Sequence, residues 1–108
     1  MTRWAVGDEV LGWVDTRGSH AELVVAEADN LVARPGGVPW EVAGSLFVAG
    51  TTAYAAVRAV SLTPGDTVVV SGAAGGVGSL SVQLAVAAGA TVIGLASSHH
   101  CRAARRRT

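Results

Sequence analysis

The longest regular pattern of apolar and polar positions in this chain lies between residues 66 and 96. Thr67–Ser71 is a β-branched run with the length and apolarity of a strand buried on both faces of a parallel sheet. Apolar residues then recur at helical spacing on one side of residues 77–88, and Gly89 follows as a typical residue after a helix C-terminus. These apolar positions are Val77, Leu80, Leu84 and Ala88. Residues 91–96 form a second apolar run, so the pattern predicts a strand, a turn, a helix and a strand, the βαβ unit that binds dinucleotides.

The turn of this unit is rich in glycine and reads Gly-Ala-Ala-Gly-Gly-Val-Gly over residues 72–78. Gly75 would let the backbone approach a pyrophosphate because no Cβ intervenes, and Gly78 would let the helix lie close to the first strand. The helix would point its N–H groups and the positive end of its dipole at the phosphates. In the usual G-x-G-x-x-G register, Ala73 replaces the first glycine. A tight turn without a ligand is the alternative, but the flanking strands and helix favour nucleotide binding.

The first 37 residues contain short alternating segments typical of an all-β module. Residues 6–14 predict a strand, and residues 19–25 predict its returning partner after a turn at Asp15–Gly18. Residues 30–35 predict a third strand, which Pro35 ends together with the glycines that follow it.

Helical spacing begins after this module. Pro39 suits a first helical turn, and the apolar face of the helix that follows consists of Val42, Leu46 and Phe47. A second helix is expected from Thr51 or Thr52 through residue 60, before a turn at residues 63–66 leads into the βαβ unit.

Composition narrows the class of protein. Half of the 108 residues are hydrophobic and 15% are charged, which excludes a disordered chain, and the formal net charge of zero gives no sign of nucleic-acid or anionic membrane partners. The single cysteine, Cys101, excludes an intramolecular disulfide and a thiol cluster for a metal. No segment has the pattern of a signal peptide or a membrane span, so we expect a cytoplasmic protein with no membrane partner.

Five motifs together resemble a known family. They are Gly-Asp-Glu-Val at 7–10, Gly-Ser-His-Ala-Glu-Leu-Val-Val at 18–25, Ala-Gly-Thr-Thr-Ala-Tyr at 49–54, Pro-Gly-Asp-Thr-Val-Val-Val at 64–70 and Ala-Ala-Gly-Gly-Val-Gly at 73–78. With them, the chain from about Val6 to about Ser97 resembles the medium-chain dehydrogenase/reductase superfamily, in its zinc-free, quinone oxidoreductase-like (zeta-crystallin-like) branch.

The resemblance implies an α/β fold in which the end of a GroES-like β module precedes the first βαβ unit of an incomplete Rossmann nucleotide-binding domain. It divides the chain into four parts. These are the C-terminal part of the GroES-like catalytic domain at 1–48, a connecting helix and turn at 49–66, the start of the Rossmann domain at 67–98 and an atypical Arg-rich tail at 99–108.

The function that the resemblance implies is hydride transfer from NADPH to a quinone or to an activated alkene or carbonyl acceptor, chemistry that the cofactor supplies. Thr52 matches the family threonine whose helix start approaches the nicotinamide, and helix capping by its hydroxyl is the alternative. No catalytic acid, base or nucleophile is identified. The pyrophosphate would be bound by backbone groups of Ala74, Gly75, Gly76, Val77 and Gly78.

The end of the second strand favours NADP(H) over NAD(H). NAD-preferring folds usually place a carboxylate there to bind the ribose hydroxyls, whereas this chain continues with Ala96 and Ser97. Ser97 could donate a hydrogen bond to the 2′-phosphate, although serine is also a common turn residue. Val48 stands where zinc-dependent relatives have a cysteine, and because valine cannot bind zinc, no metal is expected.

The family pattern ends near Ser98, and the Arg-rich residues 99–108 replace the expected helix. This tail is either a contact for nucleic acid or phosphate, or an out-of-frame translation, which we favour. The resemblance begins inside the catalytic domain, so most of the substrate contacts of the family are expected to be missing. Two strands alone would also leave apolar faces partly open to water.

The sequence therefore predicts an inactive fragment of an NADP(H)-dependent oxidoreductase that acts on a small molecule of the quinone, enone or enoyl type, and whose full-length relatives are homo-oligomers. One alternative is an enoyl-reductase module of a polyketide synthase. Another is a non-catalytic nucleotide- or nucleic-acid-binding remnant, although nucleic acid is the less favoured partner.

Overall fold

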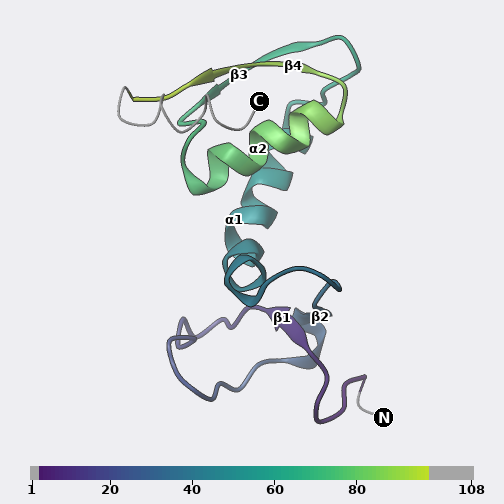
Figure 1. The fold of residues 1–108 in the computed structure, drawn as a ribbon, viewed down its shortest axis with the longest axis vertical. Helices are drawn as coiled ribbons and strands as arrows, with labels where there is room; N and C mark the ends of the chain where they lie inside the picture. Colours follow the sequence, from purple (N-terminus) through teal and green to yellow (C-terminus); the bar gives the residue numbers. More distant parts are fainter. Residues whose placement is uncertain (1–2, 98–108) are drawn as a thin grey trace. The chain divides into compact units, whose positions relative to one another are not determined.

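The computed structural model describes residues 3–97 (Figure 1). Its elements are β1 (Val10–Gly12), the short 3-10 helix η1 (Ala28–Asn30), β2 (Leu31–Ala33), α1 (Trp40–Ala59), β3 (Thr67–Ser71), α2 (Gly76–Ala87) and β4 (Thr91–Leu95). The chain forms two compact units, residues 1–48 and 49–108, and the division falls inside α1. The expected tail at 99–108 lies outside the described residues. Within residues 3–97, no helix combines the length and apolarity needed to span a bilayer.

The first unit contains a short antiparallel pair of strands. Val10 in β1 lies opposite Ala33 in β2, and Gly12 lies opposite Leu31. A Cβ at position 12 would stand 2.8 Å from a methyl carbon of Leu31 and overlap the carbonyl oxygen of Asn30, so this pairing requires glycine. The strands predicted at residues 6–14 and 30–35 are confirmed at their centres, and each is shorter than expected.

The strand predicted over residues 19–25 is wrong. This segment contains bends and no strand, and the side chains of Leu23 and Val25 are 91% and 95% exposed. Alternation of apolar and polar residues is compatible with a strand, but a strand also needs a partner for its backbone N–H and C=O groups. Here β1 pairs with β2 instead.

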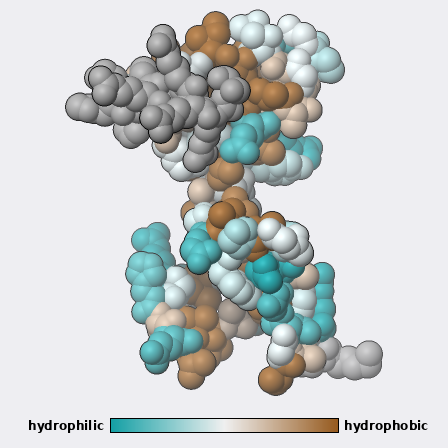
Figure 2. All heavy atoms as spheres, viewed as in Figure 1, coloured by the Kyte–Doolittle hydropathy of each residue, from teal (hydrophilic) through white to brown (hydrophobic). Residues whose placement is uncertain are grey.

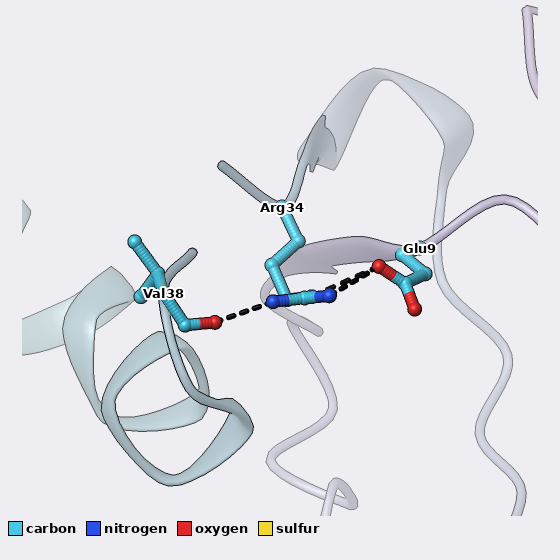
Figure 3. A network of polar contacts seen from close by, with 3 residues as sticks. All are labelled: Glu9, Arg34 and Val38. Atoms are coloured by element: carbon cyan, nitrogen blue, oxygen red, sulfur yellow. Dashed lines mark hydrogen bonds and ion pairs between the residues drawn. The ribbon is translucent and has the colours of Figure 1, made fainter. Parts of the chain in front are cut away.

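Arg34 connects the strands of this unit to the segment that leads into α1 (Figure 3). Its guanidinium forms an ion pair with Glu9, donates from Nε to Glu9 Oε2 at 3.1 Å, and donates from Nη1 to the carbonyl of Val38. The guanidinium carbon also lies 4.5 Å from the ring centre of Trp40, the first residue of α1. One side chain thus binds three separate groups of the unit.

The two helices expected between residues 39 and 60 are a single helix, α1. Pro39 precedes it, and the carbonyl of Pro39 accepts hydrogen bonds from the N–H groups of Val42 and Ala43 at 3.1 and 2.9 Å. Ala49 and Gly50 lie between the two expected helices, and α1 continues through them. One glycine costs only about 1 kcal/mol in a helix, and the alanines around it favour continuation.

The second unit contains the βαβ unit predicted from the sequence. Strands β3 and β4 are parallel, in register from Thr67 opposite Thr91 to Ser71 opposite Leu95. Helix α2 packs against both strands, as Figure 1 shows. The two buried residues of α2 are the small residues Ser81 and Ala85. Of the predicted apolar face, Leu80, Leu84 and Ala88 are half-buried and Val77 is exposed.

The sheet is covered on one face only within the described residues. Val68 and Val70 are half-buried, whereas Val69 is 58% exposed and Ile93, opposite it in register, is 51% exposed. The expectation that both faces of the first strand are buried is therefore wrong, and the expectation that an apolar face stays partly open is confirmed. Figure 2 shows apolar residues, in brown, on the surface of both units.

Candidate functional site: the glycine turn before α2

The turn between β3 and α2 is held by backbone hydrogen bonds. Gly72, directly after β3, has a φ of +68°, in the left-handed region that favours glycine. The N–H of Gly75 donates to the carbonyl of Gly72 at 2.9 Å, and the N–H of Ala73 donates to the carbonyl of Leu95 at 3.0 Å. The turn is therefore attached to the carboxyl ends of both parallel strands, which is where open α/β sheets bind ligands.

Gly78 allows α2 to begin directly against this turn. A Cβ at position 78 would stand 2.7 Å from the carbonyl carbon of Gly72 and 3.1 Å from Cα of Ala73, and it would overlap the Gly72 oxygen. All of these atoms belong to the backbone, so no side chain could move aside. The prediction that Gly78 lets the helix lie close to the first strand is therefore corrected: the atoms next to Gly78 belong to the turn at Gly72 and Ala73, directly after β3.

The first backbone N–H groups of α2 have no hydrogen-bond partner among residues 3–97. Gly75 is the N-cap residue and supplies no side-chain hydrogen bond, and the first turn of the helix contains no acidic residue. The first backbone bond at this end runs from the N–H of Ser79 to the carbonyl of Gly75, at 2.9 Å. Because the N–H groups of a first helical turn have no partner within the helix, this end is suited to bind an anion.

The other glycines of the turn differ in how far the fold requires them. A Cβ at Gly75 would lie 3.3 Å from the Gly72 oxygen, a tight contact, whereas a Cβ at Gly76 would meet no atom within 4 Å. The packing of the chain thus gives no reason for glycine at 76, but close approach of a pyrophosphate to the helix N-terminus does. Ala74, also in the turn, is exposed. The residues present fit a bound dinucleotide.

Thr52 and Ser97 were also predicted to contact the cofactor. Thr52 is an exposed residue in the second half of α1, far past the helix start at Trp40, so helix capping by its hydroxyl is wrong. Ser97 is exposed and lies two residues beyond the end of β4, whose Leu95 carbonyl contacts the turn. The contacts of both side chains with a cofactor stay predictions.

Two polar features of the second unit were not anticipated. Arg58 Nη1 donates to Tyr54 Oη at 3.1 Å, and this hydrogen bond raises the pKa of Arg58. Asp66 accepts hydrogen bonds from the N–H and the hydroxyl of Thr63, at 2.8 and 2.9 Å, and these lower the pKa of Asp66. The spacing of four residues between Tyr54 and Arg58 on one helix is the sequence signal that could have indicated the first pair.

Curated relatives with similar sequences are oxidoreductases and polyketide synthases, while no family model matches the chain. A quinone oxidoreductase of Pseudomonas aeruginosa is 37% identical over 99 residues, which cover 91% of this chain and 30% of the relative. The polyketide synthase GfsB of Streptomyces halstedii is 42% identical over 98 residues, which cover 90% of this chain and 2% of that protein.

Solved structures agree with the sequence comparison. The quinone oxidoreductase of Coxiella burnetii matches with a TM-score of 0.87 and 33% identity, over 96% of this chain and 34% of that one. The quinone oxidoreductase of Thermus thermophilus, solved also in complex with NADPH, matches with a TM-score of 0.58 and 36% identity, over 62% of this chain and 23% of that one. This chain spans about a third of the length of the quinone oxidoreductases from P. aeruginosa and C. burnetii. With its βαβ unit and glycine turn, the chain belongs to the medium-chain dehydrogenase/reductase superfamily, in the quinone oxidoreductase-like (zeta-crystallin-like) group.

Proposed function

We propose that the chain supplies the pyrophosphate-binding elements of an NADP(H)-dependent oxidoreductase that reduces a quinone or an activated alkene or carbonyl compound. The observation that supports this proposal is the N-terminus of α2, which has no side-chain cap and lies against the turn because residue 78 is glycine. The NADPH complex of the T. thermophilus relative supports the choice of a nicotinamide cofactor.

In this proposal the chain binds and orients the cofactor, which supplies the hydride chemistry. The pyrophosphate is bound by backbone N–H groups of Ala74 and residues 76–78, and Gly75, whose N–H is used inside the turn, lets the backbone come close because it has no Cβ. Thr52 orients the nicotinamide end, and Ser97 donates to the 2′-phosphate. The absence of a carboxylate after β4 supports NADP(H), because a carboxylate there would repel that phosphate. The apolar side chain of Val48 supports a site that works without zinc.

The same proposal extends to the whole protein of which such a segment is part. We propose that it acts in the cytoplasm, as a homo-oligomer, on a small molecule. The 108-residue chain alone is proposed to be inactive, because it corresponds to about a third of its quinone oxidoreductase relatives. A polyketide synthase enoyl reductase is the second candidate, supported by the 42% identity to GfsB.

Binding of the cofactor is tested by titrating the chain with NADPH and following nicotinamide fluorescence. We expect Gly76→Ala to weaken binding about tenfold, equivalent to one lost hydrogen bond to a charged group. Gly44→Ala is the matched control, because Gly44 also lies in a helix with no atom within 4 Å of an added Cβ. Equal affinity of the Gly76→Ala variant and the unmodified chain would contradict the proposal, provided that circular dichroism shows both folded.

Catalysis is tested in two chimeras, in which residues 3–97 replace the matching segment of the P. aeruginosa quinone oxidoreductase or of the CurK enoyl reductase, a solved structure that this chain resembles. We expect NADPH oxidation with a benzoquinone in the first host, whereas turnover confined to the second host, with an enoyl thioester, would favour the second candidate. Ser97→Asp is expected to move the preference of an active chimera towards NADH. No turnover in either host would contradict both candidates.

A further inference from the structure

A hollow of about 380 Å³ lies in the second unit, between the C-terminal end of α1 and the second half of α2. Its polar lining consists of Tyr54, Arg58 and Ser61, and its apolar lining of Val57, Leu62, Leu84 and Ala88. Leu84 lies eight residues beyond Gly76, about 12 Å along the helix axis. The hollow is therefore separate from the glycine turn, and the proposed function assigns it no role.

Arg58 is held beside this hollow, and one of its donors is used within the part of the chain that the structure describes. Its Nη1 donates to Tyr54 Oη at 3.1 Å, and the guanidinium carbon lies 5.7 Å from the centre of the Tyr54 ring. A guanidinium has five N–H donors, of which this contact occupies one. Among residues 3–97, no carboxylate forms an ion pair with Arg58, since the ion pair of the described chain joins Arg34 and Glu9. Within residues 3–97, the positive charge of Arg58 is thus not paired with a carboxylate.

Ser61 places a hydroxyl group on the same lining. It follows the C-terminal end of α1 with a φ of +50°, in the left-handed region, and its N–H donates to the Arg58 carbonyl at 3.1 Å. That conformation costs on the order of 1 kcal/mol for a residue with a Cβ. The hollow therefore combines a cation, two hydroxyl groups and an apolar wall.

We propose that this hollow binds a small organic carboxylate with an aromatic or short aliphatic body. The carboxylate pairs with Arg58, and the apolar body lies against Val57, Leu62 and Leu84. Charge complementarity supports this class of ligand, because an anion supplies the oppositely charged partner that Arg58 does not have among residues 3–97, and a neutral molecule does not. The volume is at the lower end of the range for small-molecule sites, which fits one ring system or a short chain.

The test uses the isotope-labelled 108-residue chain, titrated with 2-naphthoate and with the neutral 2-naphthol while backbone amide shifts are followed. We expect naphthoate to shift amides of residues 54–62 and 84–88 and to bind at least about tenfold more tightly than naphthol, as one charge-assisted contact allows. Arg58→Gln is expected to remove this difference. Arg17→Gln, the same change at an exposed arginine of the first unit, is expected to leave it intact.

Several results would overturn the proposal: equal binding of the two probes, shifts confined to other residues, or naphthoate affinity that Arg58→Gln leaves unchanged. If Arg58→Gln does not fold, Tyr54→Phe removes the hydroxyl that holds the guanidinium and is expected to weaken naphthoate binding about threefold or more. Saturating NADPH is expected not to displace naphthoate. Competitive displacement would overturn the separate site while leaving the proposed cofactor binding intact.

Discussion

Each of the two units is stabilised internally by a different kind of contact. In the first unit, side chains connect distant segments: Arg34 binds Glu9 and Val38, and Trp4 Nε1 donates to the Ala28 carbonyl at 3.0 Å. In the second unit, backbone groups and glycines have this role, as at the turn of residues 72–78. The first unit thus depends on particular side chains, with the glycine at position 12 as an exception, and the second depends mainly on where side chains are absent.

The end of α2 shows how far the backbone determines the second unit. Gly89 has a φ of +85°, its N–H donates to the Val86 carbonyl at 2.9 Å, and the N–H of Ala90 donates to the Ala85 carbonyl at 3.1 Å. This is the Schellman arrangement of a helix C-terminus, and it confirms the prediction for Gly89. Glycine therefore determines both ends of α2, so we expect the second unit to be more sensitive to an added methyl group than to loss of a polar side chain.

The largest loss of stability is expected from Gly78→Ala in the second unit. Its Cβ would overlap the Gly72 carbonyl, and because backbone atoms surround it, relief requires α2 to move away from the turn. We expect a loss of about 2–3 kcal/mol in the stability of the second unit, measured by amide hydrogen exchange in β3 and β4. Gly76→Ala, where the added Cβ meets nothing within 4 Å, is the control and should exchange like the unmodified chain. Unchanged exchange in Gly78→Ala would contradict the steric argument.

This comparison also explains which parts of the fold could be predicted from the sequence. The βαβ unit pairs β3 with β4 within 30 residues, so a local pattern of residues contains nearly all the information that its pairing needs. The segment at residues 19–25 alternates well enough for a strand, but alternation does not identify the strand that would pair with it. The prediction of two separate helices between residues 39 and 60 failed for a similar reason, because helix continuation depends on all of the neighbouring residues.

The candidate site was also predictable from the sequence only in part. The position of the turn follows from its glycines, and the structure shows that Gly78 is needed for a close approach to the turn and not to the first strand. The buried face of α2 was not predictable from hydrophobicity, because it includes a serine. The Ser81 hydroxyl donates to the Val77 carbonyl at 2.9 Å, so Ser81 can be buried like a small apolar residue. Arg58 was missed because its significance depends on a hollow formed by two helices that are distant in sequence.

A smaller effect is expected from Arg34→Ala, which tests the dependence of the first unit on side chains. The change removes the ion pair with Glu9, the hydrogen bond to Val38 and the contact with the Trp40 ring. We expect a loss of about 1–2 kcal/mol, seen as faster amide exchange in β1 and β2 and a changed Trp40 fluorescence. Exchange in β3 and β4 should not change.

Arg34→Lys sharpens this test, because it keeps the charge and loses the guanidinium fork. We expect it to recover less than half of the loss, since a lysine ammonium cannot donate to Glu9 and Val38 in the same fixed geometry. Full recovery by lysine would show that charge alone matters. Equal loss in both units would contradict the difference between them.

The smallest effect on stability is expected at Asp66, a carboxylate of the second unit that accepts two hydrogen bonds from Thr63. Hydrogen bonds from Thr63 lower its pKa below the ordinary 3.8, so the folded state favours the ionised form. Its contribution to stability is therefore complete above about pH 4 and is lost as the pH falls through the lowered pKa. Asp66→Asn does not titrate, so the difference in melting temperature between the unmodified chain and this variant should be constant from pH 7 to about pH 5 and shrink below pH 4. A difference in melting temperature that stays constant down to pH 2 would contradict this role of Asp66. The ionised carboxylate would then contribute no more to the stability of the second unit than the neutral amide of asparagine does.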